Sequence, residues 1–151
     1  MQLEEKARQI IENECDDYFL GFGDLHNTDD PRIQEYNTLF DDYPTSISIG
    51  ITIPFYNEYA NVPEIYNRTN CQLKTITMKI CDLLEDEGYS SLSFPRSNET
   101  NEPYLSLHVI AANHAKLGEI SENGKLTTPE VGSGVNWGTV LTDAPIKINT
   151  I

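Results

Sequence analysis

The 151-residue chain carries 24 acidic and 10 basic side chains, which give a formal net charge of −14 at neutral pH. Nucleic-acid affinity comes largely from Lys and Arg neutralising phosphates, so this balance excludes a protein that holds RNA or DNA by itself and disfavours an anionic membrane surface. The length fits one domain that spans residues 1–151.

The three cysteines, Cys15, Cys71 and Cys81, are widely spaced and form no C-x-x-C pair. This pattern argues against a disulfide framework and against a cysteine-based zinc or iron–sulfur site, so we expect no metal site. The opening sequence, MQLEEKARQIIENECDD, lacks the apolar core of a signal peptide, and no apolar run reaches the length of a membrane span. We therefore predict a cytoplasmic protein with reduced thiols.

The first part of the chain alternates helical and strand-like patterns. Apolar residues at helical spacing predict an amphipathic helix over residues 3–14, and the YFLGF run predicts a strand over 18–22. A loop rich in turn residues leads to a short predicted helix over 31–40. Isoleucines alternate with small residues in TSISIGITIP, which predicts a strand over 45–54. Its small face favours close packing of a helix, with another sheet or a flat ligand as alternatives.

The middle of the chain predicts a long helix, a strand and a second helix. The long helix covers residues 63–87, and Gly88 is placed as its C-terminal cap. A strand over 90–94 follows. Apolar spacing becomes helical again from Tyr104, and we expect Gly118 to end that alanine-rich helix in the left-handed region.

Two strand-like runs follow, over residues 125–130 and 135–142. We expect them to pair as a hairpin around the turn at 131–134, with Trp137 and Val140 on its apolar side. The order of predicted helices and strands is typical of an α+β fold.

Several ordered motifs lie between residues 105 and 146: His108, Ala111–Ala112, Ala115–Gly118, Lys125–Glu130 with Gly132, and Thr139–Ile146. They resemble the cobalamin-binding domain shared by epoxyqueuosine reductases and reductive dehalogenases. In that family His and Ala-Ala are followed by Ala-Gly-Leu-Gly-Trp-Ile-Gly-Lys, Leu-Leu-x-Thr-Pro-Glu-x-Gly and Val-Leu-Thr-Asp-Ala-Pro-Leu. Weaker matches at YFLGFGDL, SISIGITIP and EDEGYSSLSFP extend the similarity over most of the chain.

The resemblance implies a nitroreductase-like α+β fold, with helices packed on the faces of a mixed β-sheet and often a homodimer. It implies a cobalamin cofactor against the small-residue strand and the alanine face of the last helix. The implied cofactor-binding residues are His108, Gly118, Lys125, Leu126, Thr127, Trp137 and Gly138. For His108, a core or capping role is the alternative. Glu102 occupies the place of the acidic proton donor of the epoxyqueuosine reductases and is the candidate catalytic residue, against a plain solvated glutamate.

The chain also departs from the family pattern. The glycine-rich Gly-Leu-Gly-Trp-Ile-Gly-Lys becomes KLGEISE over residues 116–122, and no cysteine-rich cluster segment follows Ile146. We therefore expect a stand-alone module without its own iron–sulfur clusters which, if it is an active reductase, needs a ferredoxin-type electron donor. The alternatives are a non-catalytic interaction or regulatory homodimer that has lost the cofactor, and an FMN-binding oxidoreductase. Scattered arginines offer FMN no obvious phosphate clamp.

Overall fold

The computed structural model of the protein describes residues 2–26, 30–53, 62–94, 105–122, 125–132 and 134–147. The elements are α1 (Leu3–Glu14), β1 (Tyr18–Asp24), the 3₁₀ helix η1 (Pro31–Tyr36), α2 (Asn37–Asp42), β2 (Thr45–Thr52), α3 (Val62–Asp86), β3 (Ser91–Phe94), α4 (Leu105–His114), β4 (Glu119–Ile120), β5 (Leu126–Thr127) and β6 (Val135–Thr142). The helix predicted over 3–14 is confirmed at both ends. The short helix predicted over 31–40 is divided between η1 and α2, and η1 is itself kinked at Ile33, whose backbone is non-helical.

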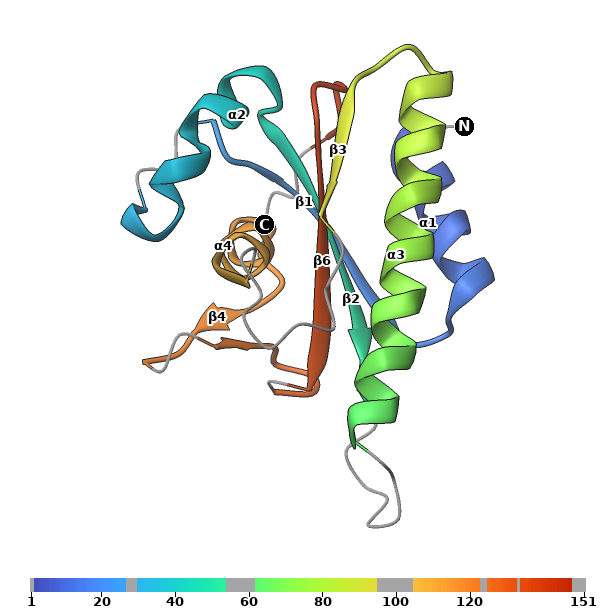
Figure 1. Ribbon diagram of the computed structural model, residues 1–151, viewed down its shortest axis with the longest axis vertical. Helices are drawn as coiled ribbons and strands as arrows, with labels where there is room; N and C mark the ends of the chain where they lie inside the picture. Colours follow the sequence, from blue (N-terminus) through green and yellow to red (C-terminus); the bar gives the residue numbers. More distant parts are fainter. Residues whose placement is uncertain are drawn as a thin grey trace.

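A four-stranded sheet in the order β1-β2-β6-β3 lies at the centre of the molecule (Figure 1). The α+β class is confirmed, but the pairings within this sheet are all antiparallel, where we expected strands of mixed direction. All residues of β6 are buried, and the strand is bordered by β2 on one edge and β3 on the other. It therefore has no edge left for residues 125–130, and the predicted hairpin is wrong. Instead, β5 pairs with β4 in a separate two-stranded sheet.

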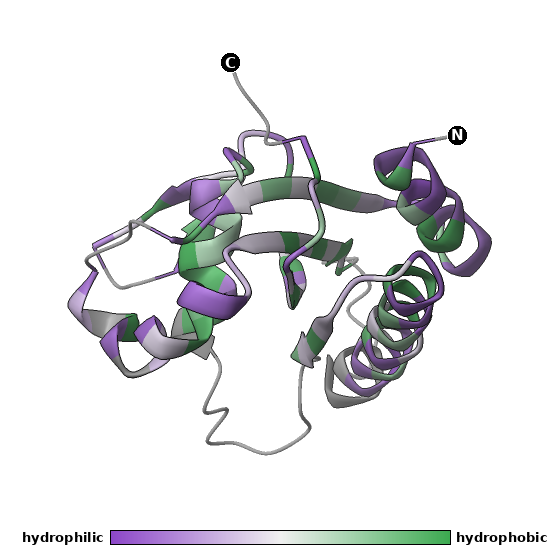
Figure 2. Cartoon of the chain, turned by 90° about the horizontal axis from the view of Figure 1, so that it is seen from above, coloured by the Kyte–Doolittle hydropathy of each residue, from purple (hydrophilic) through white to green (hydrophobic). Residues whose placement is uncertain are grey.

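One face of the central sheet is covered by α1 and α3. The isoleucines of β2 point to this side, where they meet the apolar stripe of α3 and the inner face of α1. The fully buried members of this core include Ile11, Ile47, Ile49, Leu73, Ile76, Ile80, Leu84 and Val140. Figure 2 shows the hydrophobic sides of both helices turned toward the sheet.

The opposite face is covered by η1, α2, α4 and the small β4–β5 sheet. Consecutive residues 107–112 of α4 are all buried, so the helix has no polar face over this stretch. Such a helix is typical of a core position between other elements. It packs against β1, β2 and β6 and also contacts η1 and the β4–β5 sheet.

α3 ends where the sequence predicted. Gly88 has a φ of 95°, which suits glycine, and the amide of Tyr89 donates to the carbonyl of Leu84 at 2.9 Å.

Among the described segments, we find no helix whose length and apolar content would let it cross a bilayer.

Candidate functional site

The small-residue face of the sheet is closed by α4. A Cβ atom built on Gly21 of β1 would lie 2.9 Å from the Cβ of Ala115, and one built on Gly23 would lie 3.2 Å from the Ala115 amide nitrogen. Ser46 and Ser48 on β2 are buried on the same face. The small side chains thus permit close approach of a helix, which is the packing favoured by the sequence, and the two small surfaces contact each other rather than a ligand.

His108 connects α4 to the central strand β6. Its side chain is 1% exposed, and Nδ1 lies 2.8 Å from Oγ1 of Thr139. Which of the two atoms donates depends on the imidazole tautomer. This geometry gives His108 a packing and bridging role inside the core. This role agrees with the core position that was the alternative to cofactor binding for His108.

Trp137 fills the part of the same face that lies beside Gly50. It is 7% exposed, and its ring carbons lie 2.7 and 2.8 Å from the position that a Cβ on Gly50 would occupy. Its ring centroid is 5.8 Å from that of Phe19. Together with Leu126 and residues of α4, it forms a small hydrophobic cluster that we call the Trp137 cluster: Val109, Ala112, Leu126, Val135 and Trp137.

Gly118 is needed for a close backbone contact. A Cβ atom there would lie 2.6 Å from the carbonyl oxygen of Thr127, so a side chain would push the β4–β5 sheet away. The Gly118 carbonyl accepts a hydrogen bond from Nδ2 of Asn113 at 2.9 Å. The glycine therefore lets the segment after α4 lie directly on the neighbouring strand.

The left-handed residue after α4 is Lys116, with a φ of 65°, so the prediction for Gly118 is wrong. The Lys116 amide donates to the Asn113 carbonyl at 3.0 Å, and the Leu117 amide donates to the Ala112 carbonyl at 3.1 Å. These two bonds form a Schellman-type end, in which a lysine occupies the position that glycine usually takes.

Lys125 and Thr127 form an exposed rim beside the Trp137 cluster, and Leu126 between them is buried. The Lys125 carbonyl accepts hydrogen bonds from the amide and the hydroxyl of Ser121, at 2.8 and 3.1 Å. The alternation along residues 125–127 thus turns the Leu126 side chain inward and those of Lys125 and Thr127 outward.

The structure brings most of the predicted cofactor-binding residues to one side of the sheet, with one exception. Gly138 faces α3: a Cβ atom there would lie 3.3 Å from Cδ2 of Leu73 and 3.5 Å from Cγ2 of Thr77. Successive residues of a strand point to opposite faces, so Gly138 and Trp137 cannot line one site with their side-chain positions. Glu102, the candidate catalytic residue, lies outside the described residues.

A pocket that the sequence did not indicate lies on the other face, where α1 ends. Its volume is about 350 Å³, and it is lined by Cys15, Asp16, Asp17, Ile51, Thr52, Arg68, Thr69 and Gln72. Burial, together with the neighbouring carboxylates, raises the pKa of the Cys15 thiol. Nothing local in the sequence brings Asp16 and Asp17 together with α3, because the approach of α3 to this point is a tertiary contact. Among the described residues, no group of His, Cys, Asp and Glu has the arrangement of a metal site.

Comparison with solved structures shows what the fold is similar to. A structure of epoxyqueuosine reductase with an epoxyqueuosine-modified tRNA-Tyr stem loop matches 99% of this chain with a TM-score of 0.68 and 16% identity, over 47% of its own length. Epoxyqueuosine reductase from Streptococcus thermophilus matches 99% of the chain with a TM-score of 0.63 and 15% identity, over 48% of its length.

A reductive dehalogenase whose structure suggests a mechanism for B12-dependent dehalogenation also matches 99% of this chain, with a TM-score of 0.55 and 14% identity. The chain thus spans about half of the length of the first reductase, at 47%, and 25% of the length of the dehalogenase. No family model and no curated protein matches the sequence. At these identities the likeness shows the fold, and the fold implied by the sequence motifs is confirmed.

Proposed function

We propose that the chain is a relative of the corrinoid-binding domain of epoxyqueuosine reductases and reductive dehalogenases, and that it binds a corrinoid or a related cofactor. The observation that carries this proposal is the match of the whole chain to about half of an epoxyqueuosine reductase, with a TM-score of 0.68. In this proposal the electrons come from a ferredoxin-type donor.

The packing of the core limits where a corrinoid can bind. The flat ring does not fit between α4 and the sheet, because Ala115 and Trp137 occupy the space above Gly21 and Gly50. The exposed rim of Lys125 and Thr127 offers groups that would hold the edge of a corrinoid. An ammonium, a hydroxyl and strand backbone suit the amide and phosphate groups at its periphery.

In this arrangement the protein binds and orients the cofactor from one side. Lys125 would hold a phosphate of the cofactor by its charge, and Thr127 would hold an amide by a hydrogen bond. Leu126, which lies between them, belongs to the Trp137 cluster. A bound corrinoid supplies cobalt-centred reducing chemistry. The carboxyl of Glu102 holds the proton that a reduced substrate takes up, as the resemblance implies.

A titration of the purified protein with cob(II)alamin, followed by visible absorption, tests cofactor binding. We expect saturation at micromolar concentration and quenching of the fluorescence of Trp137, the only tryptophan.

The role of the rim is tested by charge variants. Lys125→Glu should weaken binding about fivefold, as expected for the loss of one exposed charge contact of ~1 kcal/mol. Lys147→Glu makes the same charge change at another exposed site and should leave binding unchanged. Equal affinity of both variants would contradict the role of the rim.

The role of Glu102 requires a separate assay. With a reduced ferredoxin-type donor and epoxyqueuosine as free nucleoside, Glu102→Gln should lower turnover by about 10²-fold or more. Cofactor affinity should stay the same, because a proton donor acts after binding. An unchanged rate would remove Glu102 from the mechanism.

A second candidate function is a non-catalytic interaction module that has the fold without the cofactor. The closed small-residue face, with Trp137 over Gly50, favours it. Absence of corrinoid binding at micromolar concentration would select this function. A parallel titration with FMN, released by heat as a yellow chromophore, tests the flavin alternative.

A further inference from the structure

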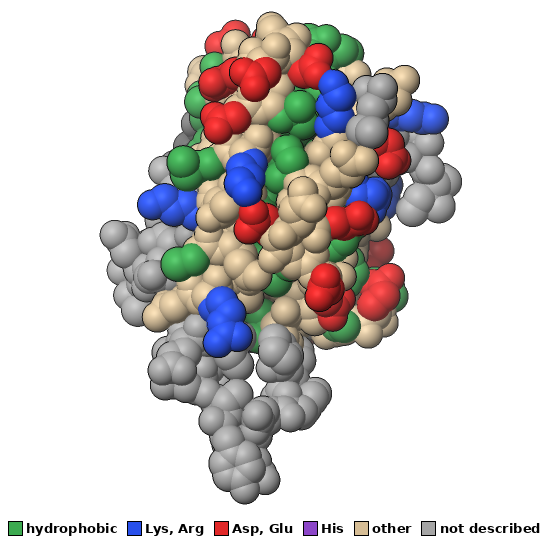
Figure 3. Space-filling model, turned by 90° about the vertical axis from the view of Figure 1, so that its right-hand side faces the viewer, with side chains coloured by type: hydrophobic (Ala, Val, Ile, Leu, Met, Phe, Trp, Pro, Cys, Tyr) green, Lys and Arg blue, Asp and Glu red, His purple; other side chains and the backbone are tan. Residues whose placement is uncertain are grey.

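The outer side of α3 carries an exposed row of residues that no described element covers. The row consists of Cys71, Lys74, Thr75, Met78, Asp82 and Glu85. Met78 is 53% exposed and is the one large hydrophobic side chain that the described residues expose. Figure 3 looks onto the face formed by α1 and α3 and shows acidic side chains gathered toward its upper end, where α3 ends.

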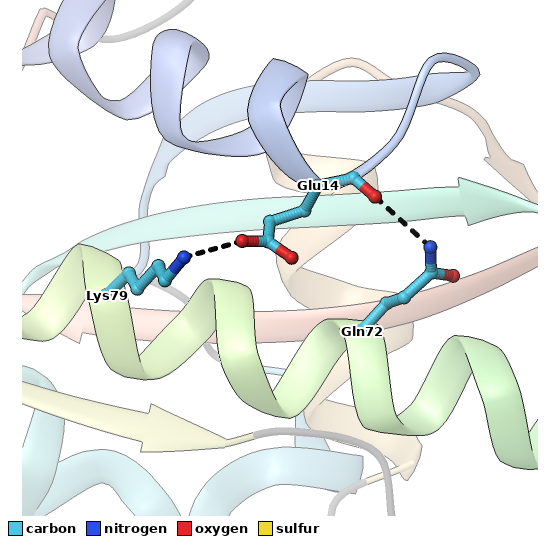
Figure 4. A network of polar contacts seen from close by, with 3 residues as sticks. All are labelled: Glu14, Gln72 and Lys79. Carbon is cyan, nitrogen blue, oxygen red and sulfur yellow. Dashed lines mark hydrogen bonds and ion pairs between the residues drawn. The ribbon is translucent and has the colours of Figure 1, made fainter.

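α1 occupies only one flank of α3 and leaves this row open. Figure 4 shows how: Nε2 of Gln72 donates to the Glu14 carbonyl at 3.2 Å, and Nζ of Lys79 lies 2.5 Å from a Glu14 carboxylate oxygen. By contrast, the Lys74 and Asp82 side chains have no hydrogen bond or ion pair with any described residue. These two charges are available to an external partner.

The charges of the row are arranged with opposite sign on the two sides of Met78. Lys74 lies four residues before Met78, and Asp82 lies four residues after it. On a helix these three positions follow one ridge, with Lys74 and Asp82 each about 6 Å along the axis from Met78. A two-fold axis through Met78 therefore places Lys74 of one copy opposite Asp82 of the other.

We propose that this ridge is the interface of a symmetric dimer, in which α3 of one copy packs antiparallel against α3 of a second copy. Met78 contacts its own symmetry mate, and two Lys74–Asp82 ion pairs border it. In an isologous interface the same surface of both copies meets, so that surface must be complementary to itself. The ridge meets this condition, because Lys74 of each copy lies opposite Asp82 of the other. The net charge of −14 disfavours contact between two copies at most other places, since acidic surface would meet acidic surface.

Charge reversal tests the pairing. Sedimentation velocity from about 10 to about 500 µM should show a concentration-dependent dimer for the wild type, as expected for a small interface. Lys74→Glu and Asp82→Lys should each weaken the dimer about tenfold or more, and the double variant should restore it because the pairs are exchanged. Lys116→Glu, an exposed lysine on the opposite side of the sheet, should leave association unchanged. A wild type that stays monomeric throughout, or single variants that associate normally, would overturn the proposal.

Cross-linking tests the axis independently. In a Cys71→Ser background, Met78→Cys should form a covalent dimer rapidly under mild oxidation, since residue 78 meets itself on the two-fold axis. Gln9→Cys, exposed on α1, is the matched control and should cross-link slowly. Equal rates of covalent dimer formation for the two variants would show that α3 of one copy does not contact α3 of the other.

Discussion

Substitution of Gly50 by alanine tests whether Trp137 fills the small-residue face of the sheet. The new methyl group would lie 2.6 Å from Cγ1 of Val135 and 2.7 Å from the Trp137 ring. Both distances are too short for carbon atoms, so the tryptophan ring has to move. Because the ring is packed against Phe19 and the Trp137 cluster, it cannot move without disturbing its neighbours.

Overpacking of this kind costs about 1–3 kcal/mol. With a middle value of ~2 kcal/mol and an m-value of about 2 kcal/mol per molar urea, the midpoint of unfolding should fall by about 1 M. Trp137→Leu frees space above the alanine. The double variant should therefore be less destabilised than the sum of the single variants, by about 0.5 kcal/mol or more.

Urea unfolding followed by circular dichroism measures all these variants, and Trp137 fluorescence reports the local change in those that retain the ring. Gly138→Ala is the matched control, because its methyl group would meet the flexible ends of Leu73 and Thr77 at 3.3 and 3.5 Å on the other face. It should cost less than Gly50→Ala and leave the emission spectrum unchanged. A neutral Gly50→Ala variant with wild-type fluorescence would refute the placement of the ring.

Three further measurements follow from the structure. Asn136→Ala removes a buried amide that donates to Oγ1 of Thr69 at 2.9 Å and to the side-chain oxygen of Asn70 at 2.6 Å. It should lower the free energy of unfolding by about 1–3 kcal/mol in urea titrations, and an unchanged midpoint would contradict the network. Maleimide should label exposed Cys71 first, because burial raises the pKa of the Cys15 and Cys81 thiols, and equal rates for all three would contradict this burial. The folded state binds these two thiol protons more tightly than the unfolded state, so stability should fall as the pH rises above their ordinary pKa of 9.0, and serine at both positions should flatten that decline.

The sequence predicted local structure well where periodic patterns were strong. The alternating isoleucines of β2 and the apolar stripe of α3 follow directly from the periods of strand and helix, and Gly88 adopts the expected left-handed conformation. Those patterns depend on residues close together in the chain, so single-sequence reasoning can detect them.

Features that depend on contacts between distant parts of the chain were harder to predict. Nothing local distinguishes a strand that pairs with its neighbour in sequence from β6, which inserts between β2 and β3. The end of α4 was misplaced because a glycine two residues further on suggested the left-handed position, whereas Gly118 serves a backbone contact with Thr127. Strand alternation alone predicts that Trp137 and Gly138 point to opposite faces of the sheet, but the implied cofactor site included both residues.

The position of β6 affects how the molecule can fold. The two strands that border it, β2 and β3, both precede it in the chain and do not pair with each other in the sheet. During synthesis, β2 and β3 emerge before the strand that joins them, and each exposes an open edge until β6 arrives. Contacts of such high sequence separation slow folding and leave strand edges available for association between chains. The isoleucine-rich β2 therefore has one unpaired edge while the chain is incomplete, which is a condition that favours aggregation.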